Sequence, residues 1–440
     1  MVLYLICYGI SWTLARQHVY MLSGLVLLPA AFWLYWKDYR RSGNLIDLKG
    51  LFCLSFVGGQ AVSCMKLSRL QGDWADLTWL CFFLAVGAVR LGAQWDGPEK
   101  LAERLAGWGR RKDGSGKEVS RKGSPEADKA RIRRRLLKAM GAITLISWGA
   151  FLLEAAVLGF IPMFSYGVPH AYSYFHISGV HYFTVSCVLV PSLFVVWLWQ
   201  EWGVQEEAGS SLWGRLKSPQ GLWALAFTAL SLAVPLLCVS RFQLILAVGM
   251  AAFTFIPIRR TFRLRYVCIL AGLMVPAYLG LTVLRSHSVA YLNGIFEMKN
   301  AATPIWITQP YMYIANNYDN FNCLVEELPA FTWGLRMLFP LWAFTGLKFM
   351  APSLVNFPLY VTKEELTTLT VIYDAYYDFG VLGVILLGVI LGMACRLLSG
   401  LRQRTDNPVI HVVYAQIAMY MALAFFTTWF SNPSTWFYLG

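Results

Sequence analysis

Long stretches of apolar residues recur along the chain, separated by shorter polar segments. A helix that crosses the hydrocarbon core of a bilayer needs about 20 mostly apolar residues. By this criterion the sequence predicts eleven membrane-spanning helices, at residues 2–15, 19–36, 46–65, 76–96, 136–160, 179–199, 220–239, 242–258, 266–284, 369–396 and 409–430. The pattern therefore predicts an all-α, polytopic integral membrane protein in which residues 1–440 form a single membrane domain.

The composition supports this fold class. Hydrophobic residues make up 57% of the 440 residues and charged residues only 14%, whereas about 25% of the residues in a typical soluble domain are charged. The mean hydropathy is +0.52. A water-soluble protein of this size could not keep so much apolar surface out of solvent, so the composition excludes the soluble classes.

The basic residues alternate between the two sides of the predicted membrane. With the amino terminus inside and the carboxyl terminus outside, the inner loops contain 27 Lys and Arg residues, and the short outer loops contain only Arg16, Lys66, Arg69 and Arg241. Lys and Arg are enriched in cytoplasmic loops, so we expect this orientation. Attraction of the inner loops to anionic lipids accounts for the net charge of +13, and no nucleic-acid partner is needed.

Two connections between the predicted spans are long. Residues 97–138 form a basic cytoplasmic loop, and we expect residues 126–138 to extend the fifth span as a basic helix. Residues 285–368 form a large extracytoplasmic loop, whose many aromatic residues argue against disorder. We expect this second loop to fold as a cap over the active site, with short helices in the membrane interface.

Charged side chains at the ends of spans indicate a function or a partner, because they are costly near lipid. On the outer side, Arg241 lies between two closely spaced spans, and Arg285 follows the ninth span. The planar guanidinium group matches the oxygens of a phosphate. These two arginines are candidates for binding a phosphate-bearing lipid, and ordinary contacts with lipid headgroups are the alternative.

Several titratable side chains lie in the predicted spans. Asp374 and Asp378 are four residues apart, so they share a helix face next to Tyr377. A carboxylate there can accept a proton from a hydroxyl group or hold an arginine in place, and the pattern favours neither. We expect Glu154 to bind polar groups or to pair with a neighbour, and His181 to be structural. The sequence has no metal-ligand spacing and no nucleotide-binding glycine loop, so we expect no metal or other cofactor.

Three short stretches resemble the O-antigen polymerase (Wzy-type) family, also called the oligosaccharide repeat-unit polymerases. They are Ser240-Arg241, Tyr313-Ile314-Ala315-Asn316-Asn317-Tyr318-Asp319-Asn320-Phe321, and Tyr377-Asp378-Phe379-Gly380 with Gly383. Each stretch is short, but the number of spans and the single large outer loop extend the resemblance to the topology of most of the chain. Family members commonly have one span more than the eleven predicted here, which places a twelfth within 285–368 or implies an early carboxyl terminus.

The resemblance implies a GT-C-like glycosyltransferase at the outer face of the bacterial cytoplasmic (inner) membrane, acting in the synthesis of a polysaccharide such as lipopolysaccharide O-antigen or capsule. The substrate would be an oligosaccharide repeat unit carried on undecaprenyl diphosphate. The growing chain would be transferred to the next repeat unit, with release of the lipid diphosphate. Membrane lipids, a flippase and a chain-length regulator would be its partners.

The resemblance and the charges together suggest roles for particular residues. Arg241 and Arg285 would stabilise the leaving diphosphate, with Arg336 as a third cation. The base for the acceptor hydroxyl would be Asp378, Asp374 or His287, in that order. Sugar rings would contact aromatic and polar side chains of the outer loop and the tenth span: Trp306, Tyr313, Asn316, Asn317, Tyr318, Asp319 and Tyr377.

Two other functions stay open. A flippase for lipid-linked oligosaccharides would share the spans and the lipid diphosphate, but transporters typically have internal repeats and short loops on both sides. The sequence shows no convincing repeat. An O-antigen ligase-type transferase would use the same machinery with a different acceptor.

Overall fold

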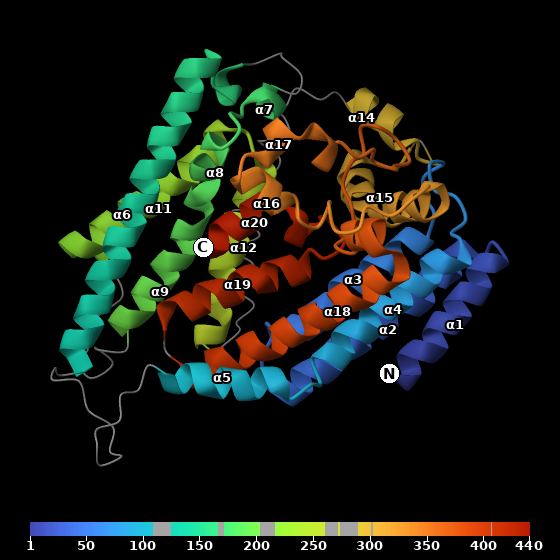
Figure 1. The fold of residues 1–440 in the computed structure, drawn as a ribbon, viewed down its shortest axis with the longest axis horizontal. Helices are drawn as coiled ribbons and strands as arrows, with labels where there is room; N and C mark the ends of the chain where they lie inside the picture. The colour runs from blue at the N-terminus through green and yellow to red at the C-terminus, as the bar shows by residue number, and fades with distance from the viewer. Residues whose placement is uncertain are drawn as a thin grey trace. The chain divides into compact units, whose positions relative to one another are not determined.

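The computed structural model describes residues 1–108, 125–165, 171–202, 216–259, 272, 289–300, 302–405 and 407–440. In these residues the regular structure is helical, apart from one isolated bridge between Ser68 and Met298 (Figure 1). The chain forms two compact units. The first contains Met1–Ala102, Ser288–Gly400 and Tyr420–Gly440, and the second contains Glu103–His287 and Leu401–Met419.

The first unit begins with four helices that pack in chain order. They are α1 (Val2–Arg16), α2 (Tyr20–Ser42), α3 (Leu48–Cys64) and α4 (Asp76–Gly92), and α2 packs against both α1 and α3. The carboxylate of Asp47 caps α3 by accepting a hydrogen bond from the backbone N–H of Gly50, at 2.8 Å. Helix α5 (Gly97–Trp108) follows and continues from the first unit into the second.

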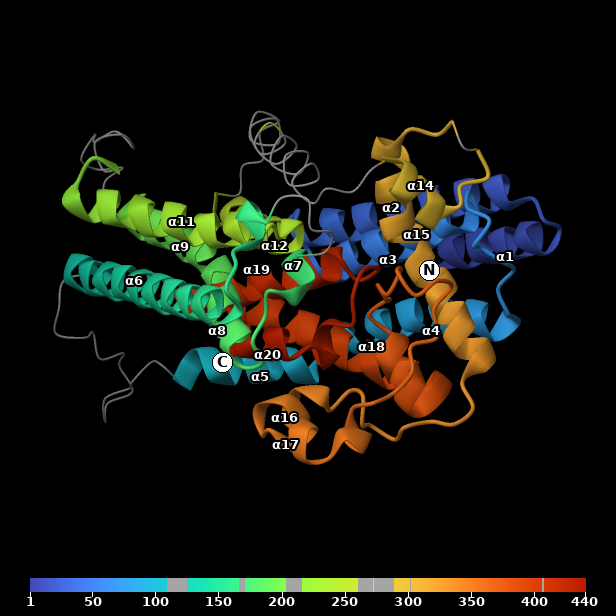
Figure 2. The ribbon, with the colours of Figure 1, turned by 90° about the horizontal axis from the view of Figure 1, so that it is seen from above.

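The rest of the first unit comes from the second half of the chain. It contains α14 (Val289–Phe296), α15 (Ile305–Glu327), α16 (Phe339–Phe344), α17 (Leu347–Met350), η3 (Pro352–Leu354), η4 (Trp429–Ser431) and α20 (Pro433–Leu439). Helix α15 packs against α3, α4 and α14, whereas α16 packs against α17 and α20 (Figure 2). Helix α18 (Tyr373–Arg404) begins in this unit and ends in the other.

Glycine determines two features of α18. At Gly380, φ is +61° and ψ is −142°, so the helix has a kink seven residues after its start. Further along, Gly392 lies so close to α4 that an added Cβ would be 2.1 Å from the carbonyl oxygen of Val89. A larger residue would be strained at the first position and would push the two helices apart at the second.

The second unit is a helical bundle around a core that includes Met140, Val190, Val196, Trp197 and Ala224. Its helices are α6 (Pro125–Leu158), η1 (Pro162–Phe164), α7 (Ala171–Tyr174), α8 (Val180–Val185), η2 (Ser186–Leu189), α9 (Val190–Trp202), α11 (Pro219–Leu237), α12 (Arg241–Arg259) and most of α19 (Pro408–Ala422). Helix α9 packs against α6, α11 and α12.

The expected class of an all-helical protein with apolar, membrane-length helices is confirmed. Among the described residues, five helical segments are long and apolar enough to cross a membrane: Asp128–Leu158, Val180–Gln200, Pro219–Leu237, Arg241–Ile258 and Tyr373–Arg404. The bent pair Asp76–Gly92 and Gly97–Gly107 would add a sixth, and Val2–Arg16, Leu48–Cys64 and Pro408–Ala422 are shorter apolar helices. The predicted span 266–284 lies outside the described residues except for Gly272, and the total of eleven or twelve stays a prediction.

The structure also bears on the two long connections. Helix α6 begins at Pro125, which confirms that residues 126–138 continue the fifth span as a helix. The described part of 285–368 is largely helical and includes the 23-residue α15, longer than the short helices expected there. This helix is not among those apolar enough to span a membrane. The described residues of this loop therefore supply no twelfth span.

Candidate functional site

A turn at residues 332–338 is fixed to the start of α18 by one carboxylate. Asp378 accepts hydrogen bonds from the backbone N–H groups of Arg336, at 3.2 Å, and Met337, at 2.8 Å. It also accepts one from the hydroxyl group of Thr332. Because Asp378 is fully buried and binds three donors, its main effect is to set the conformation of the segment that carries Arg336.

The side chain of Arg336 is held by the second aspartate of α18. Its Nε and Nη2 atoms each lie 2.7 Å from Oδ1 of Asp374, and the hydroxyl group of Ser431 donates to Oδ2. The guanidinium carbon lies 4.5 Å from the centre of the Tyr377 ring, which is a cation–π contact. The sequence allowed two roles for Asp374, accepting a proton or holding an arginine in place. Its contacts with Arg336 are those of the second role.

The ion pair keeps the arginine charged. Burial alone would lower the pKa of Arg336, but the neighbouring carboxylate of Asp374 outweighs burial, so the pKa is raised. The two charges cancel, and the pair is neutral as a whole.

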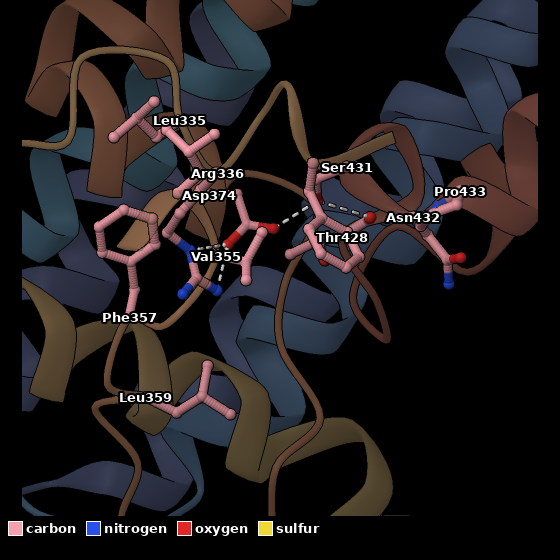
Figure 3. A pocket seen from close by; sticks show the side chains of 12 residues that line it. Leu335, Arg336, Val355, Phe357, Leu359, Asp374, Thr428, Ser431, Asn432 and Pro433 are labelled. Atoms are coloured by element: carbon pink, nitrogen blue, oxygen red, sulfur yellow. Dashed lines mark hydrogen bonds and ion pairs between the residues drawn. The ribbon is translucent and has the colours of Figure 1, made fainter. Parts of the chain in front are cut away.

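Arg336 and Asp374 line a pocket of about 420 Å³ within the first unit (Figure 3). One part of its wall is apolar and consists of Leu335, Phe339, Leu354, Val355, Phe357, Leu359 and Pro433. Another part is polar and consists of Thr428, Ser431 and Asn432. Pockets of about 300–1,000 Å³ commonly bind small molecules, and this mixed wall suits a ligand with both polar and apolar parts.

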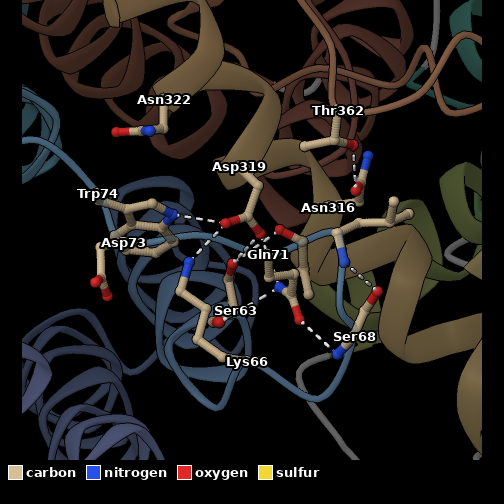
Figure 4. Close-up of polar contacts among 12 residues, drawn as sticks. Ser63, Lys66, Ser68, Gln71, Asp73, Trp74, Asn316, Asp319, Asn322 and Thr362 are labelled. Carbon is tan, nitrogen blue, oxygen red and sulfur yellow. Dashed lines mark hydrogen bonds and ion pairs between the residues drawn. The ribbon is translucent and has the colours of Figure 1, made fainter. Parts of the chain in front are cut away.

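A second polar cluster lies around Asp319 on α15 (Figure 4). Its carboxylate accepts hydrogen bonds from Lys66 Nζ (2.6 Å), Trp74 Nε1 (2.7 Å), Gln71 Nε2 (2.7 Å) and Ser63 Oγ (3.1 Å). Asp319 and Lys66 are both buried. The cluster joins α15 to α3 and to the connection between α3 and α4.

The neighbours of Asp319 that were expected to contact carbohydrate are also buried. Asn317 donates a hydrogen bond to the carbonyl of Phe425 (2.7 Å), and Tyr318 donates one to the carbonyl of Phe56 (2.6 Å). Asn316 is likewise in the interior. The polar groups of these three residues and of Asp319 bind other parts of the chain. Their observed role is therefore in packing, which differs from the expected contacts with carbohydrate.

The other three aromatic candidates occupy different environments. Trp306, in the first turn of α15, is 69% exposed and can contact lipid or ligand. Tyr313 is partly buried, with its ring 6.2 Å from that of Phe426. Tyr377 is buried beneath the guanidinium group of Arg336 and supports the pocket wall.

Arg241 is the first residue of α12 in the second unit. The tight connection that the sequence predicts is present, since α11 ends at Leu237 and Val239 adopts a φ of +52°. The side chain of Arg241 is buried, whereas the sequence led us to expect a guanidinium directed toward the headgroups. Arg285 and His287 lie outside the described residues, so the pairing of Arg241 with Arg285 stays a prediction.

Several contacts in the first unit could not be expected from local sequence patterns. In the sequence, Lys66 is one of the few basic residues of the outer connections, and no motif marks Gln71 or Trp74. Ser431 follows the last predicted span and shows no local pattern that links it to Asp374, 57 residues earlier. These partners are distant in sequence, so only the fold identifies them.

Among the described residues, no group of three or more His, Cys, Asp or Glu side chains is placed to hold a metal ion. Comparisons of the chain with protein-family models, with curated proteins and with solved structures find no significant match. The function therefore has to be inferred from the residues of the chain itself.

Proposed function

We propose that this protein is an inner-membrane glycosyltransferase that polymerises oligosaccharide repeat units carried on undecaprenyl diphosphate. It would act at the outer face of the membrane through eleven or twelve spans in a GT-C-like arrangement. Its amino terminus would be inside and its carboxyl terminus outside. The observation that best supports this proposal is the pocket beside Arg336, in the segment predicted to be extracytoplasmic.

The pocket suits a substrate of this class. A lipid-linked oligosaccharide combines an apolar chain, a diphosphate and several hydroxyl groups. Aromatic residues such as Phe339 and Phe357 offer flat apolar surfaces, and Thr428 and Asn432 offer partners for hydroxyl groups. Arg336 adds a guanidinium whose position is fixed before a ligand arrives.

The proposed reaction requires a cation and a base. The acceptor hydroxyl attacks the anomeric carbon while the bond to the diphosphate breaks, and the electron pair leaves with the diphosphate. Arg336, whose charge is balanced by Asp374, would donate hydrogen bonds to the substrate in the pocket. Arg241 and Arg285 stay the proposed cations for the leaving diphosphate, as the sequence suggests. Asp378 and Asp374 already bind several donors, which favours a positioning role for both and leaves His287 as the proposed base.

Deletion of the gene in its host tests the class of reaction. Loss of a polymerase should leave single capped repeats on a gel of the surface polysaccharide. Loss of a flippase should leave no repeats, and loss of a ligase should leave polymer attached to its lipid carrier. Either of these last two patterns would contradict the proposal in favour of the corresponding alternative.

Substitution of Arg241 tests the assigned chemistry. Arg241→Ala should abolish polymer while the protein still inserts at normal levels, because the leaving diphosphate loses a cation. Arg69→Ala, which removes an exposed arginine from an outer connection, is the matched control and should leave polymer unchanged. Normal polymer length in Arg241→Ala would remove this residue from the mechanism.

A further inference from the structure

A carboxylate and an imidazole face each other in the second unit, and the proposed function uses neither. Glu154 lies on α6 with its side chain fully buried, and His181 is the second residue of α8 with its side chain 26% exposed. Nδ1 of His181 lies 3.1 Å and 3.2 Å from the two carboxylate oxygens. The pair therefore connects the interior of the unit to its surface.

The other contacts of Glu154 determine which group donates. The backbone N–H of Ile177 donates to Oε1 at 2.9 Å, and the hydroxyl group of Thr184 donates to Oε2 at 2.7 Å. A buried carboxylate with these donors is stabilised as an ionised acceptor. Nδ1 of His181 must then carry the hydrogen atom, which leaves a lone pair on Nε2 of the neutral ring.

The second ring nitrogen of His181, Nε2, is the one that a ligand could reach. Among the described residues, no hydrogen bond is made to this atom, the side chain is 26% exposed, and the ring of His176 lies edge-on with centroids 6.1 Å apart. A carboxylate bound to Nδ1–H fixes the orientation of the ring and stabilises the imidazolium that forms when Nε2 takes a proton.

We propose that Glu154 and His181 form a proton-accepting site for a hydroxyl-bearing ligand at the surface of the second unit. The O–H bond of the ligand breaks, an N–H bond forms at Nε2, and the electron pair of the O–H bond stays on the ligand oxygen. Glu154 is a positioning residue that stabilises the imidazolium. The site goes beyond the proposed function, because it involves neither the Arg336 pocket nor a particular glycan.

The reactivity of His181 tests this site on the purified full-length protein. Diethyl pyrocarbonate acylates the free imidazole nitrogen, and mass spectrometry reports the rate at each histidine at pH 8, where an ordinary imidazole is neutral. We expect Glu154→Gln, which keeps the shape and removes the charge, to slow acylation of His181 by about tenfold, roughly the value of one charge-assisted hydrogen bond. His18, which is 67% exposed and lies in the first unit, is the internal control and should react at the same rate in both proteins. An unchanged rate at His181 would overturn the proposal.

A second measurement needs no substitution and covers the case in which Glu154→Gln fails to fold. The ¹⁵N NMR spectrum of histidine-labelled wild-type protein at pH 8 distinguishes the two neutral forms of the ring. We expect His181 to carry its hydrogen atom on Nδ1. The opposite form, with hydrogen on Nε2, would leave no lone pair for a ligand and would overturn the proposal. Neither measurement depends on polymer synthesis. A negative result would therefore contradict the Glu154–His181 site without bearing on the proposed function.

Discussion

Two carboxylate–cation pairs in the first unit have the same chemistry and different surroundings. Lys66 Nζ lies 2.6 Å from Asp319, and Arg336 Nη2 lies 2.7 Å from Asp374. The side chains of the first pair are 5% and 3% exposed, whereas those of the second are 13% and 6% exposed and line the pocket of about 420 Å³. Each pair joins the segment 285–368 to another part of the unit.

This difference shows that the surroundings of a pair, more than its residue types, decide what it can do. Around Asp319, donors from three other side chains and the Trp74 ring, 4.0 Å from Lys66 Nζ, enclose the charges. Such a pair can fix α15 in place but has little surface for a ligand. Arg336 is equally well fixed, yet it borders a pocket, so it can both hold the fold and contact a ligand.

Breaking the enclosed pair should have the largest effect on stability. Lys66→Met leaves the carboxylate of Asp319 buried without its cation, which should lower the free energy of unfolding by about 3–5 kcal/mol. Thermal unfolding in detergent measures this loss. Arg69→Met, three residues away and exposed, is the matched control and should change stability little. A loss in Lys66→Met no larger than that in the control would show that the pair does not hold α15.

The buried position of Asp319 also shows which features of the fold local sequence can predict. The length of the apolar stretches predicted the five apolar helices of membrane length, and residues 126–138 were correctly expected to extend α6, because these features depend on local composition. The polar stretch around Asn316–Asp319 was interpreted as a ligand surface. Its partners Phe56, Lys66 and Phe425 are more than 100 residues away, so no local pattern reveals that this face of α15 is buried.

The candidate site was predictable only in part, for the same reason. The spacing of Asp374 and Asp378 predicted that both lie on one face of a helix, and both lie in the first two turns of α18, where each contacts Arg336. The turn at 332–338, which places Arg336 between them, depends on backbone donors that a sequence pattern does not display.

The next largest loss of stability is expected for Asp378→Asn, and this variant distinguishes a positioning role of Asp378 from a catalytic one. Asp378→Asn replaces one acceptor oxygen with an NH₂ group facing the donors of the 332–338 turn, so we expect a loss of about 2 kcal/mol in the free energy of unfolding. Thermal unfolding checks this, with the exposed Glu364→Gln as the control. Unchanged stability together with loss of polymer would instead indicate that Asp378 is the base.

A pair of serine substitutions, one of which has the smallest expected effect, gives the sharpest contrast between the two ion pairs, because each pair has one serine that donates to its carboxylate. Ser63 Oγ can donate to Asp319 or to the carbonyl of Ala315, and Ser431 Oγ can donate to Asp374 or to the carbonyl of Thr428. In Ser63→Ala no water can readily replace the lost donor, so the expected loss is about 2 kcal/mol.

In Ser431→Ala, water in the pocket can approach Asp374 and supply the missing hydrogen bond, so the expected loss is only about 0.5–1 kcal/mol. Both variants remove the same atom next to the same kind of ion, and thermal unfolding under identical conditions compares them directly. Equal losses, or a larger loss in Ser431→Ala, would mean that the pocket beside Arg336 is closed to water in the folded protein. Water would then reach neither carboxylate, and the proposal of a ligand site at Arg336 would fail.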